Sequence, residues 1–203
     1  MLKLLVAALL VTAAAPGAQT PASSPIIENA NVTVWDVSGG AIESIGAATD
    51  RDVVVIYLLP ESTQGKVDYL AQGSDVAAKV KASGATRAMV IALKDRPAAP
   101  LPNTSGFPDA FPRAGNLRKP IDNARVVVWD YTFEPGRATV MHFHPRDVVT
   151  VYLKEGANVS TAPNGTKTSN EFSFGTVRFN PRNRTHTETV VRGESHIISV
   201  ELK

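Results

Sequence analysis

Hydrophobic residues along this chain gather in short runs rich in valine, isoleucine and aromatic side chains. Glycine, proline or asparagine separates the runs, which is the pattern of β-strands joined by turns. Many short strands at this spacing predict an all-β sandwich or barrel. One segment, 74–81 (SDVAAKVK), is a candidate helix. The strands are predicted at Val32–Asp36, Asp52–Leu59, Arg125–Phe133, Val148–Leu153, Glu171–Phe174, Thr176–Phe179, Thr187–Val191 and His196–Leu202.

The strand pattern occurs twice, because residues 29–59 resemble residues 123–156 in order and spacing. A match that continues through both halves predicts a duplicated supersecondary unit. The alignment sets the candidate helix at 74–81 against a predicted strand, so a strand there is the alternative. The matched pairs are Trp35–Asp36 with Trp129–Asp130, 51–54 with 146–149, 65–69 with 175–179, and 87–94 with 196–203.

The N-terminus has the layout of a secretory signal peptide over residues 1–22. Lys3 precedes an apolar run over 4–14, and small residues follow that run. An uncleaved membrane anchor is the alternative, but the run is shorter than the about 20 residues that a bilayer span takes. We therefore expect an exported protein, periplasmic or secreted, that no membrane segment holds after cleavage.

A proline-rich stretch separates the two copies. Residues 95–120 hold six prolines, which remove backbone donors and fix φ, so neither a strand nor a long helix is expected there. We interpret the stretch as a linker that wraps the surface. The expected organisation is then a first domain over 23–94, the linker over 95–120 and a second domain over 121–203.

Composition excludes several classes of protein. The chain carries 21 basic and 19 acidic side chains, a formal net charge of +2, which is too balanced for a protein that binds nucleic acid by neutralising phosphates. It has no cysteine, so disulfide frameworks, thiolate zinc sites, iron–sulfur clusters and cysteine nucleophiles are excluded.

Three of the four histidines form the candidate site. His142 and His144 are separated by one residue, and on a strand such residues project from the same face. A third histidine, His186, follows the sequence PRNRT. Imidazole suits zinc, copper, iron and nickel, so the pattern predicts a metal site.

These residues resemble the two motifs of the cupin superfamily. Gly136, His142, His144 and Gly156 match the first motif, G-x5-H-x-H-x3,4-E-x6-G. The second motif is G-x5-P-x-G-x2-H-x3-N, and Gly175, Pro181 and His186 match it. Asn183 replaces the second motif's middle glycine, and asparagine also tolerates positive φ. With the repeat, the resemblance implies an all-β bicupin: two double-stranded β-helix (jelly-roll) barrels that share an apolar interface, because each half is small for an independent core.

The chain departs from the cupin pattern at two positions. Counting back from Gly156, Val149 stands where the first motif has glutamate, and Val190 stands where the second has asparagine. Three histidines without that carboxylate resemble the three-histidine cupins, some of which are non-haem iron dioxygenases. The implied cofactor is a divalent metal, iron first, with zinc, nickel, copper or manganese as alternatives.

The first half lacks the candidate ligands. Ala47 and Thr49 align with His142 and His144, and Val76 aligns with His186. Gly73 stands where the second half has Asn183, so the turn is kept while the histidines are not. We expect this copy to be structural, or to bind something without a metal.

Several other side chains are candidates for the surroundings of the metal. Glu188 follows His186 by two residues and is a fourth ligand, an acid–base group or a surface charge. Asp147 has a counterpart, Asp52, in the half without histidines, so a turn role is expected for both. Arg178, Arg182 and Arg184 either bind a substrate carboxylate or form a solvated rim. Trp129, Tyr131 and Phe133 alternate on one strand, where they line a pocket, fill the core or form the interface between halves. His196, which aligns with Arg87, has no motif support.

Two functions remain open from the sequence. The first is an exported metalloenzyme, with a dioxygenase as its leading form, that binds a small oxygen-bearing molecule at the metal on His142, His144 and His186. The second is a non-catalytic cupin that binds a small molecule or has a structural role. A homodimer is compatible with either function.

Overall fold

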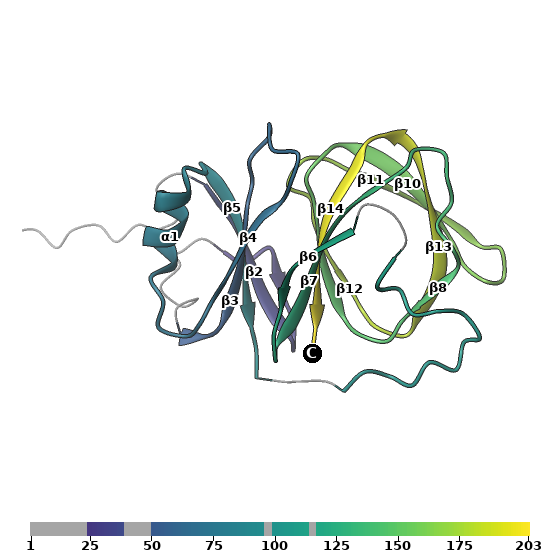
Figure 1. Cartoon of the computed structure of the whole chain (residues 1–203), viewed down its shortest axis with the longest axis horizontal. Coiled ribbons are helices and arrows are strands. Elements are labelled where there is room, and N and C mark those ends of the chain that lie inside the picture. The colour runs from purple at the N-terminus through teal and green to yellow at the C-terminus, as the bar shows by residue number, and fades with distance from the viewer. Residues whose placement is uncertain (1–23, 39–49, 96–98, 114–116) are drawn as a thin grey trace, which may run out of the picture.

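The computed structural model describes residues 24–38, 50–95, 99–113 and 117–203, and within them the chain is almost entirely β. The all-β prediction is confirmed. These residues form three antiparallel sheets and one helix, α1 (Val76–Ser83) (Figure 1). The strands are β1 (Ile27–Glu28), β2 (Val32–Ser38), β3 (Val53–Tyr57), β4 (Lys66–Leu70), β5 (Arg87–Leu93), β6 (Leu117–Asp122), β7 (Val126–Phe133), β8 (His142–His144), β9 (Val148–Tyr152), β10 (Gly156–Thr161), β11 (Lys167–Phe172), β12 (Val177–Asn180), β13 (Arg184–Gly193) and β14 (Ser195–Leu202).

The C-terminal half is a jelly roll of two facing sheets. One sheet has the strand order β12-β9-β14-β7-β6, and the other has the order β11-β10-β13-β8. Long connections carry the chain from one sheet to the other, so that strands adjacent in sequence often lie in different sheets. The jelly-roll prediction is therefore confirmed for this half.

The N-terminal half repeats one of these two sheets. Its order, β1-β2-β5-β3-β4, has the same connectivity as β6-β7-β14-β9-β12. The second sheet of a barrel is not found among its described residues, so a complete second barrel is not confirmed. The reason is length: residues 58–65 join β3 to β4, whereas the β10–β11 hairpin fills 153–176 between β9 and β12. Ala47 and Thr49 lie outside the described residues.

Helix α1 lies where the repeat sets a strand, so the alternative of a strand at 74–81 is wrong. Asp75 caps its N-terminus by accepting a hydrogen bond from the backbone N–H of Ala78, and Gly84 ends it with φ 76°. Val76 and Val80, four residues apart, are buried against the outer face of the N-terminal sheet. Residues four apart share a face in a helix and also in a strand, so the positions of these two valines do not distinguish the two structures.

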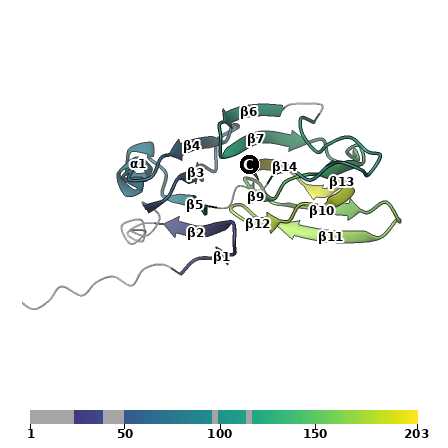
Figure 2. The same ribbon diagram turned by 90° about the horizontal axis from the view of Figure 1, so that it is seen from below.

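The helix and three sheets form layers, which Figure 1 shows side by side and Figure 2 shows from below. The largest apolar cluster lies between the N-terminal sheet and the β12-β9-β14-β7-β6 sheet, which confirms the predicted interface between halves. Alternation divides each strand between two layers. In β9, Val149 and Val151 face the N-terminal half, whereas Thr150 and Tyr152 face into the jelly roll. Fully buried strands such as Val53–Tyr57 therefore read as continuous apolar runs.

The proline-rich stretch contains a strand, which corrects the prediction for 95–120. Its last residues begin β6, which pairs with β7 at the edge of the sheet. Pro120 is tolerated because the register shifts between Arg118 and Ile121, and edge strands and bulges are where proline occurs in sheets. The described part of 99–113 is mostly exposed, as expected for a wrapping segment, and lies along β8, where Ala110 N–H donates to the Phe143 carbonyl at 2.7 Å.

The predicted signal peptide, residues 1–22, lies outside the described residues, which begin at Ser24. Over the described part of the chain, no helix has the length and hydropathy needed to cross a bilayer.

Candidate metal centre

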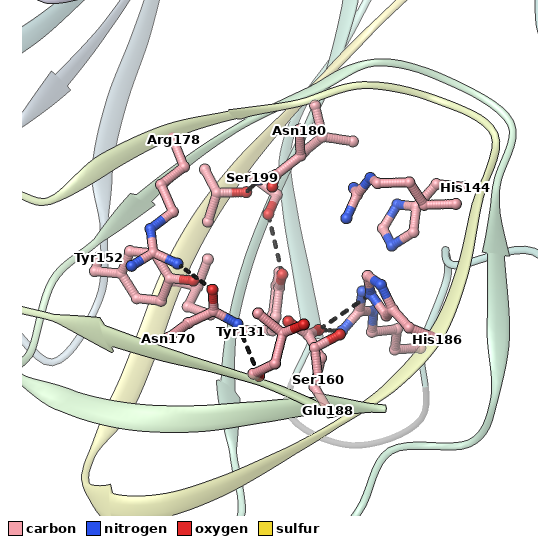
Figure 3. A pocket seen from close by; sticks show the side chains of 16 residues that line it. Tyr131, His144, Tyr152, Ser160, Asn170, Arg178, Asn180, His186, Glu188 and Ser199 are labelled. Atoms are coloured by element: carbon pink, nitrogen blue, oxygen red, sulfur yellow. Dashed lines mark hydrogen bonds and ion pairs between the residues drawn. The ribbon is translucent and has the colours of Figure 1, made fainter. Parts of the chain in front are cut away.

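The three histidines predicted from the motifs meet inside the jelly roll. His142 and His144 come from β8 and His186 from β13, and the pairing of these strands sets His186 directly opposite His142. One nitrogen from each ring lies within 4.8 Å of the corresponding nitrogens of the other two. All three side chains are buried, and the ring centroids are 4.8–5.0 Å apart. Figure 3 shows His144 and His186 turned toward each other at one end of a pocket.

Several nitrogens in this cluster lack hydrogen bonds. Both ring nitrogens of His144 and Nε2 of His186 are buried without a partner among the described residues. Burial, and then the charge of Arg113, lowers the pKa of His142 to about 3. Burial likewise lowers the pKa values of His144 and His186. The rings are therefore neutral near pH 7, which is the form in which imidazole binds a metal.

His142 is oriented by both of its ring nitrogens. Nδ1–H donates to the Val140 carbonyl at 2.7 Å, which fixes the tautomer and leaves Nε2 as the acceptor. Arg113 Nη2 donates to that Nε2 at 3.1 Å. The guanidinium of Arg113 also lies over the rings of Phe111 and Tyr131, with its central carbon 4.8 and 5.2 Å from their centroids.

Glu188 is not a surface charge. It faces the same cavity as His186, and its Oε2 lies 3.3 Å from Arg113 Nη1 and 3.8 Å from His186 Nε2. Burial by itself would raise the pKa of Glu188, but the charge of Arg113 lowers it below its ordinary value. Glu188 is therefore an ionised carboxylate beside the histidines, held by an arginine.

Val148, and not the neighbouring Val149 that aligns with the motif glutamate, faces the cavity. Val149 packs between the two halves, whereas Val148 lines the cavity. Val149 therefore does not line the pocket, because alternation along β9 turns it away. No carboxylate occupies either position.

A pocket continues from the histidines between the two sheets. It has a volume of about 250 Å³, and hydrogen-bonding side chains form most of its wall. Figure 3 shows Arg178 and Tyr152 at the end away from His144 and His186, with Tyr131 and Ser199 between. The lining residues are Arg113, Tyr131, His144, Val148, Thr150, Tyr152, Ser160, Thr168, Asn170, Arg178, Asn180, Arg184, His186, Glu188, Ile197 and Ser199.

The three clustered arginines separate into two groups. Arg178 and Arg184 both line the cavity. Arg182 instead donates through Nη1 to the Ala99 carbonyl at 3.0 Å, and its backbone N–H donates to Asp147 Oδ1 at 2.7 Å. Of the three arginines that lie close together in the sequence, only two therefore line the cavity.

Asp147 has the expected turn role, and so does its counterpart. The carboxylate of Asp147 holds the backbone N–H of Arg182, just before Asn183, which has φ 66°. In the first half, Asp52 accepts from the backbone N–H of Gln72 at 3.0 Å, just before Gly73 with φ 82°. Both turns therefore keep the aspartate and a residue with positive φ, glycine in the first half and asparagine in the second, as the repeat and the asparagine substitution predict.

The aromatic residues of β7 divide between core and pocket. Trp129 is buried in the core of the jelly roll, where Phe111 stacks on it at 5.1 Å. Tyr131 lines the cavity, and its hydroxyl lies 3.0 Å from Ser199 Oγ. These side chains face into the jelly roll, so the interface between halves is the wrong interpretation.

His196 is satisfied away from the site. Its Nε2 lies 2.7 Å from Asp130 Oδ1, and Asp130 also accepts from Arg118 Nε and from the backbone N–H of Gly65. The aligned Arg87 pairs with Asp36, at the same place in the repeat. His196 therefore has a structural role that joins β14 to β7 and to the first half.

The sequence missed Arg113 and Phe111. Both lie in the proline-rich stretch and have no counterpart in the motifs or the repeat. Their approach depends on the path of that stretch along β8, where Phe143 N–H donates to the Pro108 carbonyl at 2.8 Å. No local sequence pattern signals such a path.

Comparison with known proteins gives partial matches. No family model matches the chain. The β-alanine degradation protein BauB of Pseudomonas aeruginosa is 38% identical over 61 residues, which are 30% of this chain and 59% of BauB. This chain therefore spans less than two thirds of that relative.

Solved structures also match about half of the chain. A cupin domain from Bordetella pertussis is 26% identical over 48% of this chain and 96% of that chain, with a TM-score of 0.40. The polyketide cyclase RemF from Streptomyces resistomycificus is 23% identical over 42% of this chain and 63% of that chain, with a TM-score of 0.36.

Proposed function

We propose that this chain, whose C-terminal half is a cupin domain by its strand order and histidine spacing, holds a divalent metal on His142, His144 and His186 and binds a small oxygen-bearing molecule beside it. The observation that carries the proposal is the set of buried nitrogens without hydrogen bonds on His144 and His186. A buried polar atom without a partner is unfavourable, and a metal would satisfy these atoms.

The three histidine nitrogens are suitable ligands for a divalent metal. Three neutral imidazoles suit iron, zinc, copper and nickel, and they leave coordination positions for other ligands. We propose iron first, with zinc, nickel, copper or manganese as the alternatives. When bound, such a metal supplies a Lewis acid, and iron in addition supplies a centre for reaction with oxygen. Glu188, beside His186, adds negative charge that would favour a cation at this place.

The residues of the chain perform the other parts of the function. The Val140 carbonyl orients His142, and Tyr131 and Ser199 present hydroxyl groups to a ligand in the cavity. The leading activity is oxygenation of a small substrate in this space.

A non-catalytic binding protein is the second candidate. The observation that favours it is the ion pair between Glu188 and Arg113, at 3.3 Å, which keeps the one carboxylate of the described cavity wall ionised. With the histidines used as ligands, Glu188 is the one carboxylate among the described lining residues that could accept a proton, and its ion pair with Arg113 makes it a weak base.

The first test is metal content by plasma mass spectrometry on protein purified without added metal. We expect near-stoichiometric metal in the native chain and its loss in His144→Gln, which removes the imidazole at similar volume. The matched control is His196→Gln, which removes a buried histidine outside the site and should keep the metal. Equal metal content in the two variants, or none in folded native protein, would overturn the proposal.

Oxygen consumption distinguishes the two candidates. The iron-loaded chain is mixed with small carboxylic acids, and oxygen uptake is followed beside binding. Uptake that is lost in His144→Gln supports the oxygenase. Binding without uptake supports the non-catalytic protein instead.

A further inference from the structure

The cavity beside the histidines contains more positive charge than its own carboxylates balance. Arg113, Arg178 and Arg184 line it, whereas Glu188 is the one carboxylate among the described lining residues. Arg113 forms an ion pair with that carboxylate, with its Nη1 3.3 Å from Glu188 Oε2. Two guanidinium groups therefore remain, together with the charge of any metal on the histidines.

Arg184 is the arginine next to the histidines. Alternation along β13 sets Arg184, His186 and Glu188 on the face that lines the cavity, and Arg184 pairs in register with His144. Its Nε donates to the Pro181 carbonyl at 2.6 Å, and over the described ranges no carboxylate lies within ion-pair distance of it. The Arg184 side chain is half-buried, so its guanidinium has lost part of its hydration. A partly desolvated guanidinium without a carboxylate is suited to binding an anion.

Arg178 lies at the other end of the cavity and is fixed in place. Its Nη1 donates to Asn170 Oδ1 at 2.9 Å, and its guanidinium lies 5.7 Å from the centroid of the Tyr152 ring. Figure 3 shows these three side chains together, away from His144 and His186. Like Arg184, Arg178 has no carboxylate at ion-pair distance among the described residues.

The wall between the two arginines is polar and neutral. Thr150 accepts from Asn180 Nδ2 at 3.0 Å, and Tyr131 and Ser199 contact each other through their hydroxyls. The volume of about 250 Å³ is below the range of about 300–1,000 Å³ usual for drug-sized ligands. The space therefore suits a short molecule with a charged group at each end.

We propose, resting on the metal site proposed above, that the ligand of this cavity is a small dicarboxylate. One carboxylate lies beside the histidines and is bound by Arg184, and the other is bound by Arg178. Two anionic groups match the two guanidinium groups that lack a carboxylate, and the hydroxyls of Tyr131 and Ser199 face the middle of the molecule. Arg178 and Arg184 are thus the residues that determine specificity.

The test is calorimetric titration of succinate, butyrate and inorganic phosphate into the full chain loaded with zinc, a redox-inert probe. Succinate and butyrate have the same carbon chain length and differ by one carboxylate. We expect succinate to bind about tenfold or more tightly than butyrate, as a charge-assisted guanidinium contact implies. Equal affinity for the two acids, or tighter binding of phosphate, would overturn the proposal.

Three variants test which arginine binds each carboxylate of the ligand. Arg184→Met should weaken both acids about tenfold or more, whereas Arg178→Met should weaken succinate alone and abolish its preference over butyrate. The matched control is Arg182→Met, since Arg182 contacts the Ala99 carbonyl instead of the cavity. Circular dichroism and thermal melts establish that each variant is folded. Unchanged succinate binding in folded Arg184→Met would contradict the assignment.

Failure of the metal site and failure of this proposal are distinguishable. Metal content and succinate binding are measured on the same samples, with and without zinc. If the chain takes up no metal even when zinc is added, but still binds succinate through the two arginines, the dicarboxylate is supported and the metal site is overturned. Bound metal without any succinate binding would overturn the dicarboxylate and leave the metal site standing.

Discussion

Arg113 joins the segment between the two halves to the candidate metal ligands. It donates to His142 Nε2, the atom that a metal would use, and forms an ion pair with Glu188. The two contacts have opposite consequences for a metal. The hydrogen bond competes with it for His142, while the ion pair keeps a carboxylate nearby.

We expect Arg113→Met to tighten zinc binding by about tenfold. A hydrogen bond of about 1 kcal/mol need no longer break when the metal binds, and a positive charge is removed from its neighbourhood. Competition with a chromophoric chelator measures the dissociation constant. The matched control is Arg137→Met, because Arg137 forms an exposed pair with Glu134. Weaker zinc binding in Arg113→Met would instead mean that the arginine holds His142 in place for the metal.

At this scale the sequence predicts the parts of the candidate site that depend on local geometry. The i, i+2 spacing of His142 and His144 fixes their common face, and the same alternation aligns Glu188 with His186. The burial of Glu188 is not predictable in this way, because it depends on Arg113 arriving from a distant segment. The spacing of the first motif allows its glutamate position to fall at Val148 or Val149, which face opposite sides of β9, so the sequence alone does not say which of the two lines the cavity.

Among the elements, the turn that leads into β13 positions His186. Asn183 adopts φ 66°, and its backbone N–H donates to the His144 carbonyl at 2.9 Å, so the turn is attached to the strand that carries the other histidines. Asp147 holds the preceding residue from the other side. The same turn in the first half uses Gly73.

We expect Asn183→Ala to lower the free energy of unfolding by about 1 kcal/mol, because alanine tolerates the left-handed conformation poorly. Asn183→Gly is the control, since glycine adopts this conformation without steric cost, and its stability should stay within about 0.5 kcal/mol of the native value. Urea unfolding followed by circular dichroism measures both. An equal loss in the two variants would show that the asparagine side chain, not the backbone, stabilises the turn.

Most strands are predictable because they are β-branched runs bounded by turn residues. β1, β6 and β10 are not among the predicted strands. At β6, Pro120 argues against a strand until the bulge that accommodates it is known. Helix α1 is ambiguous for another reason. Its buried Val76 and Val80 satisfy both a helical and an alternating pattern, and only the caps at Asp75 and Gly84 decide between them.

For the whole molecule, the largest apolar cluster belongs to neither half alone. Side chains of β3 and β5 pack against those of β9 and β14 between the two sheets. The size of each half predicts such an interface, but the absence of a complete second barrel from the described residues depends on the short β3–β4 connection. The repeat alone could not reveal it, because the aligned segments are the ones that both halves keep.

We expect the chain to unfold as one cooperative unit. Trp35 lies in the outer core of the first half and Trp129 in the core of the jelly roll, so Trp35→Phe and Trp129→Phe each leave one reporter. In each variant the fluorescence and circular dichroism midpoints in urea should coincide. Ile198→Ala, at the shared interface, should lower stability by about 3 kcal/mol and move both reporters together. Separate transitions would contradict a shared core.

The contact of Phe111 and Arg113 with the jelly roll bears on how the site is inherited. A gene fragment that began at residue 121 would encode all three histidines, Arg178 and Arg184, but not Arg113, which contacts Glu188 and His142. Recombination between related chains at that boundary would therefore combine one lineage's ligands with another lineage's Arg113. The complete site can therefore be inherited only together with part of the proline-rich stretch that precedes the second domain.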